Sequence, residues 1–101
     1  MRGKDGEVHL DEAGSELHER IKMWRRKEAT RVGYDSSLVL HRITMGRIAL
    51  AKPTDSEGVA NIEGIQAWQA ETHGEALAAT VRDFEADLSS GRWKPGRRRR
   101  R

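Results

Sequence analysis

Six cationic side chains fall within twelve consecutive residues, and this pattern suits the binding of phosphate groups. They are Arg20, Lys22, Arg25, Arg26, Lys27 and Arg31. On a helical wheel they avoid the apolar stripe of Leu17, Ile21 and Trp24 and cover most of the outward surface. Only Glu28 interrupts the run, whereas helix stabilisation favours opposite charges four residues apart. The run therefore indicates a surface for a polyanion such as nucleic acid; the alternative is a face that meets only solvent.

Further cations continue this pattern along the chain. Three fall on or just after the next predicted helix and five end the chain: Arg42, Arg47, Lys52, Arg97, Arg98, Arg99, Arg100 and Arg101. Adjacent arginines repel one another, so we expect the tail to stay mobile and to reach phosphates without base specificity. The alternative is that the tail contacts the acidic segment around residues 71–87 of the same chain.

Two aromatic side chains lie near these cations. Tyr34 falls in the loop before the second predicted helix. Its ring either stacks on a base of a bound nucleic acid or is partly buried beside Val32. Trp93 has a cation on either side, and it either stacks on an exposed base or covers the end of the preceding helix.

No set of residues predicts catalysis or a metal site. The four histidines lack metal-ligand spacing, such as two histidines four residues apart on a helix. Asp83 and Glu85 form an Asp-x-Glu pair, and on a strand the two side chains of such a pair point the same way and can hold metal ions together. On a helix the two carboxylates point about 160° apart and do not share a metal. We therefore expect no catalytic residue, no metal, no cofactor and no enzymatic activity.

The elements that position these residues are all expected to be helical. Apolar spacing predicts helices over about 16–32, 42–51, 55–61, 66–73 and 75–88. Ser15 is the expected N-cap of the first, and Thr54 with Glu57 forms a capping box before the third. Residues 38–40 are expected to be extended chain. Trp24 and Trp68 fall on apolar stripes and are expected in the core.

Size and composition indicate one compact domain of about five helices with flexible termini. We expect a flexible segment at 1–14, a helical domain at 15–89 and a disordered basic tail at 90–101 of the 101 residues. The absence of cysteine excludes disulfides and thiolate metal sites. No apolar run is long enough for a membrane span or a signal peptide. A soluble, cytoplasmic domain that is monomeric when isolated is the resulting expectation.

Charge is strongly segregated along the chain. Residues 20–52 carry a net charge of +7 and residues 92–101 carry +7, whereas residues 1–19 carry −4 and residues 53–91 carry −7. The overall charge of +3 hides this polarity. A small polarised domain of this kind favours polyanion binding over catalysis.

Several landmarks occur in a fixed order along the chain. The first is Trp24-Arg25 on the first predicted helix. Met45 and Ile48-Ala49 then precede Pro53, and Ile62-Glu63-Gly64 and His73-Gly74 follow in turn. In this order of landmarks, roughly residues 17–86 resemble the HRDC domain, the helicase-and-RNase-D C-terminal module.

The resemblance implies a compact helical bundle that binds nucleic acid and has no active site. Such modules sit at the C-terminal end of RecQ-type helicases and ribonuclease D-type exonucleases, where they help to dock single-stranded or structured DNA or RNA. We therefore expect an accessory module that binds phosphate backbone weakly and without strong sequence specificity. The alternative hypothesis is a protein-interaction or regulatory module, which docks on a partner or its parent enzyme through the acidic surface of residues 53–91.

Overall fold

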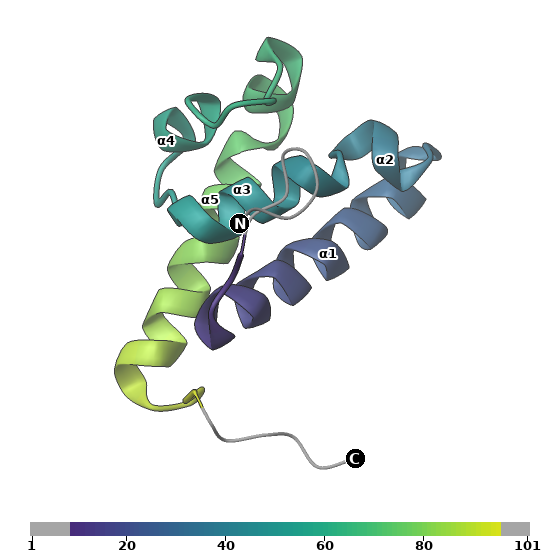
Figure 1. The fold of residues 1–101 in the computed structure, drawn as a ribbon. Coiled ribbons are helices and arrows are strands. Elements are labelled where there is room, and N and C mark those ends of the chain that lie inside the picture. The colour runs from purple at the N-terminus through teal and green to yellow at the C-terminus, as the bar shows by residue number, and fades with distance from the viewer. Residues whose placement is uncertain (1–8, 96–101) are drawn as a thin grey trace.

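The computed structural model describes residues 9–95 of the chain. These residues form five helices and no strand, in the order α1 (Glu12–Val32), α2 (Ser36–Val39), α3 (Arg42–Ala51), α4 (Ser56–Ala60) and α5 (Ala67–Ser90) (Figure 1). The prediction of an all-α bundle of about five helices is confirmed. The flexibility predicted for residues 1–8 and 96–101 lies outside the described residues.

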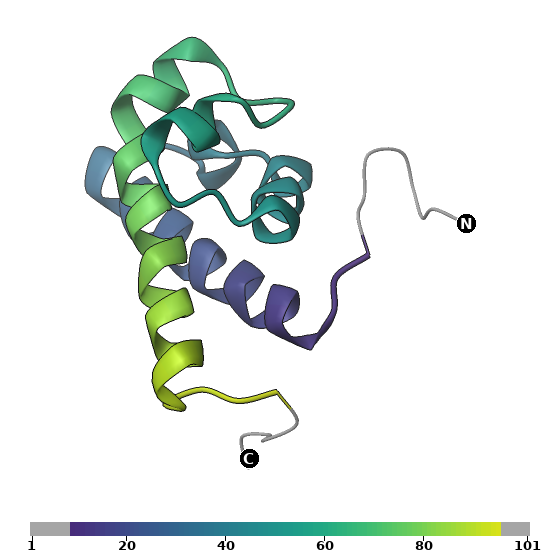
Figure 2. The same ribbon diagram turned by 90° about the vertical axis from the view of Figure 1, so that its left-hand side faces the viewer.

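Two long helices, α1 and α5, form the frame of the bundle, and the three short helices pack onto them. Figures 1 and 2 show α1 running obliquely across α5, with α2 and α3 folding back along α1 and α4 lying against α5. The core between them is apolar. Its largest fully buried side chains come from every helix and from the residue after α2: Leu17, Ile21, Val39, Leu40, Met45, Ile48, Val59, Leu77, Val81 and Phe84.

Helix α1 begins at Glu12, four residues earlier than predicted, because Asp11 rather than Ser15 is its N-cap. The Asp11 carboxylate accepts a hydrogen bond of 2.7 Å from the Gly14 amide. This bond satisfies one of the backbone donors that a helix leaves free at its start. At the other end Gly33 stops the helix as predicted, with a φ of 80° and its amide donating to the Ala29 carbonyl.

Residues 36–39 form a short helix, so the prediction of extended chain at 38–40 is wrong for its first two residues. The Asp35 carboxylate accepts from the Ser37 amide at 2.9 Å and starts this turn. Leu40, which follows the turn, is extended and fully buried. Similarly, Asp55 rather than Thr54 caps α4, since its carboxylate accepts from the Gly58 amide at 2.7 Å.

The predicted break at His73-Gly74 is wrong, because α5 runs without interruption from Ala67 to Ser90. A Cβ placed on Gly74 would lie 3.3 Å from the Cβ of Ser56 on α4. The glycine therefore lets α4 approach α5 closely, and this packing offsets the cost of glycine inside a helix.

Of the three tryptophans, Trp68 differs from its predicted environment. Trp24 is partly buried against the core, but Trp68 is 44% exposed, so its assignment to the core is wrong. Trp93 packs on Phe84 with ring centroids 5.5 Å apart. It covers the end of α5, which is one of the two positions predicted for it. Tyr34 is exposed at the end of α1.

Candidate nucleic-acid interface

The six cations of α1 lie along two edges of the helix. Arg20, Lys27 and Arg31 are seven and four residues apart, so they line the edge that faces α5, here called the α5 edge. Lys22 lies three residues before Arg25 and four before Arg26, so they share one side of the helix, here called the α3 edge, from which Arg25 reaches the Leu40 carbonyl before α3. The sequence pattern treated them as one surface, whereas the packing of the helices divides them.

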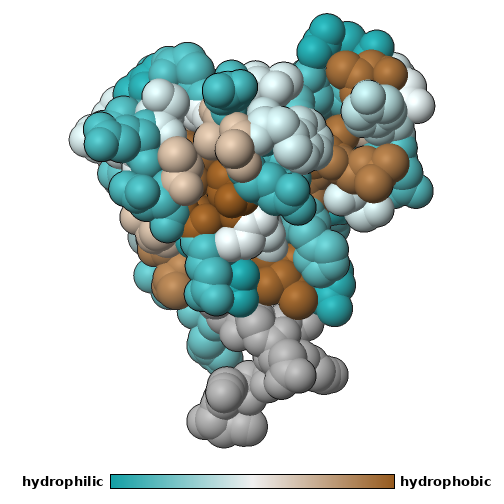
Figure 3. Space-filling model, turned by 90° about the horizontal axis from the view of Figure 1, so that it is seen from above, coloured by the Kyte–Doolittle hydropathy of each residue, from teal (hydrophilic) through white to brown (hydrophobic). Residues whose placement is uncertain are grey.

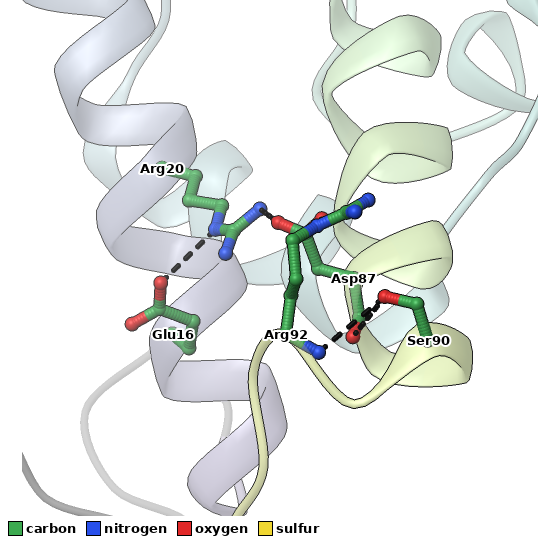
Figure 4. Close-up of polar contacts among 5 residues, drawn as sticks. All are labelled: Glu16, Arg20, Asp87, Ser90 and Arg92. Carbon is green, nitrogen blue, oxygen red and sulfur yellow. Dashed lines mark hydrogen bonds and ion pairs between the residues drawn. The ribbon is translucent and has the colours of Figure 1, made fainter.

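Arg20 on the α5 edge is held by two carboxylates. Its Nε donates to Glu16 at 3.0 Å, and its Nη1 donates to Asp87 of α5 at 2.9 Å (Figure 4). The guanidinium also lies 5.1 Å from the centroid of the Phe84 ring. Asp87 accepts a second hydrogen bond of 2.9 Å from Arg92. The bond from Arg92, and after it the bond from Arg20, holds the pKa of Asp87 below its usual value. Arg20 therefore joins two helices and is not available to a ligand.

Arg31 at the end of the α5 edge is paired with Glu28 on the same helix. Its Nε donates to Glu28 Oε1 at 3.0 Å, and its Nη2 donates to the other carboxylate oxygen. This pairing lowers the pKa of Glu28. Lys27, beside them, is exposed, and its side chain has no partner within residues 9–95. Lys27 is thus the cation of this edge that has no partner in the described part of the chain.

The α3 edge presents its positive charge with little compensation. Arg26 is exposed and its side chain has no partner among the described residues, and the Lys22 ammonium lies 4.0 Å from Glu19, at the limit of an ion pair. Arg25 donates to the Leu40 carbonyl at 2.8 Å, while its buried Nε has no partner in the described part of the chain. Burial lowers the pKa of nearby His18, and the charges of Lys22 and Arg25 act in the same direction.

The three predicted cations of α3 and its C-cap do not form one group. Arg42 is exposed in the first turn of α3, two residues after the carbonyl that Arg25 binds. Arg47 lies elsewhere and donates to the Glu63 carbonyl at 3.0 Å, which holds the loop before α5. A Cβ on Gly64, whose φ is 99°, would lie 3.1 Å from Arg47 Nη1, so glycine is needed there. Lys52 is the partly buried C-cap of α3.

The structure thus brings together Lys22, Arg25 and Arg26 on one edge of α1. Arg42 of α3 follows two residues after Leu40, whose carbonyl Arg25 binds. Arg20 and Arg31 are paired with carboxylates, while Arg25 and Arg47 each donate to a backbone carbonyl. Arg42 also takes part in an interaction within the molecule. Tyr34 lies at the end of α1, and Arg97, Arg98, Arg99, Arg100 and Arg101 lie outside the described residues. The sequence pattern missed Asp87 as the partner of Arg20, since no local signal relates residues 67 positions apart.

Acidic side chains gather on the other helices. The exposed carboxylates of α4, of the loop after it and of α5 include Asp55, Glu57, Glu63, Glu71, Glu75 and Asp83. Arg82 lies among them, paired with Glu75 at 2.6 Å and donating to the Thr54 carbonyl at 2.9 Å. Within residues 9–95 no group of three histidine or acidic side chains is placed to hold a metal ion, and none of the helices there is long and apolar enough to cross a membrane.

Comparison with known proteins gives one finding. A family model described as the HRDC domain matches residues 15–81, which is more than half of the 101-residue chain. The matched stretch extends from the first turn of α1 into the second half of α5 and includes both edges of α1. No curated protein and no solved structure gives a significant match.

Proposed function

The chain belongs to the HRDC family, and from this premise we propose that it binds the phosphate backbone of nucleic acid through the α3 edge of α1. The HRDC domain is an accessory, non-catalytic domain that generally binds nucleic acid. In this chain Lys22, Arg25 and Arg26 form the proposed contact surface, and Arg42 extends it toward α3.

The availability of positive charge on this edge is the observation that supports the proposal. Arg26 has no partner among the described residues, and Lys22 has only a distant one. A cation that lacks an internal carboxylate keeps its full attraction for a phosphate, and it releases condensed counterions from the nucleic acid on binding. A few phosphate contacts give modest affinity that falls steeply with salt and does not depend on base sequence.

The identity of the larger protein is a second part of the proposal. By family, we propose that the chain is the C-terminal module of a ribonuclease D-like exonuclease or a RecQ-like helicase, where it docks single-stranded or structured DNA or RNA. The basic tail from Arg97 to Arg101 adds non-specific phosphate contacts in this proposal.

Charge reversal at Lys22 and Arg26 tests the proposed surface. The K22E/R26E variant should bind a fluorescent oligonucleotide at least about tenfold more weakly at low salt, and the slope of log K against log salt should fall by about 0.9 for each lost contact. Anisotropy titrations with single-stranded, duplex and branched DNA and RNA at several salt concentrations measure both quantities. Truncation after Gly96 should weaken binding to all these ligands alike. Unchanged affinity of K22E/R26E at the lowest salt would exclude the α3 edge.

Protein interaction through the acidic surface of α4 and α5 is the second candidate function. It is favoured by the exposed carboxylates on these helices, which would meet a basic partner. The face seen in Figure 3 carries hydrophobic areas separated by hydrophilic side chains, so an extended apolar docking face is not evident from this side. The same K22E/R26E variant separates the two functions, because it should leave binding of a basic protein partner intact.

A further inference from the structure

His73 of α5 is enclosed between two tryptophans and faces the ion pair of the α5 edge. Its side chain is only 6% exposed, and its ring meets Trp24 and Trp68 edge-on, with centroids 5.2 and 6.0 Å away. Its Nδ1 lies 3.7 Å from Glu28 Oε2, the carboxylate that Arg31 binds. Glu28 therefore has two possible cationic partners, one permanent and one that requires a proton.

The two partners differ in their access to a ligand. The Arg31 side chain is 67% exposed, whereas Glu28 is 14% exposed. A phosphate that binds Arg31 has to draw it away from Glu28, and this leaves a partly buried carboxylate without its counter-charge. Such a loss carries a cost, because partial burial reduces the solvation of the unpaired charge. A protonated His73 would replace the missing charge without moving either helix.

We propose that the α5 edge is a second phosphate-binding surface, which opens when His73 takes a proton from solvent and pairs with Glu28, so that Arg31 becomes free to join Lys27. This inference rests on the proposed function, since its ligand is the same nucleic-acid backbone. At neutral pH the α3 edge would bind alone, and in acid both edges would bind.

The charges around His73 set the direction of the pH effect. Burial lowers the pKa of His73, Glu28 opposes this shift and Arg31 adds to it. Trp24 of α1 packs against the ring and is uncharged, as is Trp68 on the same helix as His73. On the element packed against α5, Asp55 at the N-cap of α4 and Glu57 of α4 are exposed, and Glu75 of α5 itself is paired with Arg82. Glu28 and Arg31 are thus the charges that act on the ring.

Linkage fixes the sign of the coupling. Arg31 lowers the pKa of His73 in the free protein. When a phosphate draws Arg31 away, this effect is lost, so the pKa of His73 in the complex rises above that in the free protein. The complex then binds more protons than the free protein, so affinity must increase as the pH falls through the interval between the two pKa values. Burial holds the pKa of His73 in the free protein below its ordinary value, so the full gain requires acidic solution.

The first test needs no nucleic acid and therefore separates this inference from the proposed function. In the Arg31→Ala variant, removal of the guanidinium should raise the pKa of His73, which is measured from the pH dependence of its ring resonances by NMR. The Lys27→Ala variant removes an unpaired cation from the same edge and serves as the matched control, with a smaller effect. An unchanged His73 pKa in Arg31→Ala would overturn the inference, whatever the protein binds.

The second test measures binding of a single-stranded oligonucleotide at pH 7.5 and pH 5.5. The wild type should bind roughly three- to tenfold tighter at pH 5.5, the range expected for one added hydrogen bond of ordinary net strength. The His73→Gln variant should show a smaller gain than the wild type. The Glu28→Gln variant frees Arg31 at any pH, so it should already bind tighter at pH 7.5.

The outcomes of the second test distinguish the two proposals. If His73→Gln shows the same pH gain as the wild type, or if Glu28→Gln binds no tighter at pH 7.5, the inference is overturned and the α3 edge stands. If the wild type fails to bind at either pH, the proposed function falls, and the pH-controlled edge falls with it. Circular dichroism at both pH values establishes that each variant is folded.

Discussion

The two edges of α1 carry the same kind of side chain but differ in what lies across from them. On the α5 edge, Arg20 meets Asp87 and Arg31 meets Glu28. On the α3 edge, Arg25 meets a neutral backbone carbonyl and Arg26 meets no described side chain. A count of cations in a helix therefore overstates its charge toward a ligand. The carboxylates that pack against the helix determine which of its charges remain available.

The difference also assigns the two edges different roles. The α5 edge holds the two long helices together, since Arg20 lies over the Phe84 ring while it binds Asp87. These ion pairs are partly exposed, so each contributes little to stability alone. Most of the stability of this joint comes instead from the apolar contacts beneath it, which include Phe84, Trp93 and Leu17.

Removal of the Phe84 ring should produce the largest effect on this joint. Phe84 is fully buried and carries Arg20 on one side and Trp93 on another. The Phe84→Ala variant should lower the free energy of unfolding by about 3–5 kcal/mol, the usual cost of such a cavity. Urea denaturation followed by circular dichroism measures it. The Leu50→Ala variant changes an exposed leucine and should cost less than about 0.5 kcal/mol. Comparable losses in the two variants would contradict the described core.

Neutralisation of two cations on each edge compares the edges directly. At pH 7.5 the K22Q/R26Q variant should bind an oligonucleotide about five- to tenfold more weakly, whereas R20Q/R31Q should lose less than about twofold. Both variants remove two positive charges, so a difference between them reports the position of the charge and not its amount. Fluorescence anisotropy at low salt gives the dissociation constants. Equal losses would show that overall charge, and not the α3 edge, controls binding.

The helical fold was largely predictable from the sequence because its signals are local. The end of α1 at Gly33 and the end of α3 before Pro53 follow from backbone preferences that act within a few residues. The errors arose where a distant contact decides the outcome. Gly74 breaks a helix by propensity, yet it lies within α5 because Ser56 of α4 packs against it.

The candidate site was less predictable for the same reason. The sequence identifies every cation of α1, but the pairing of Arg20 depends on Asp87, which the fold brings from the far end of α5. Likewise Trp68 satisfies the helical spacing of a core residue, although it lies in the first turn of α5, where little chain is left to cover it. Periodicity gives the direction of a side chain relative to its own helix only, and the neighbours have to come from the structure.

Loss of the ion pair between Arg20 and Asp87 should have the smallest effect on nucleic-acid binding. It tests whether this pair keeps Arg20 from contacting the nucleic acid. Asp87→Asn removes the negative charge that holds both Arg20 and Arg92, while its amide oxygen still accepts one hydrogen bond. The variant should bind nucleic acid about two- to threefold tighter at low salt, because a guanidinium becomes available on the α5 edge. Anisotropy titrations against the wild type at pH 7.5 measure this gain.

Asp83→Asn supplies the matched control for this release. Asp83 is exposed on the same helix, and its replacement changes the net charge by the same amount without touching Arg20. If net charge alone governed affinity, the two variants would tighten binding equally. A larger gain in Asp87→Asn shows that the carboxylate acts on one particular arginine. Asp87 of α5 would then determine whether Arg20 of α1 can contact a ligand. The sequence of α1 alone does not reveal this control.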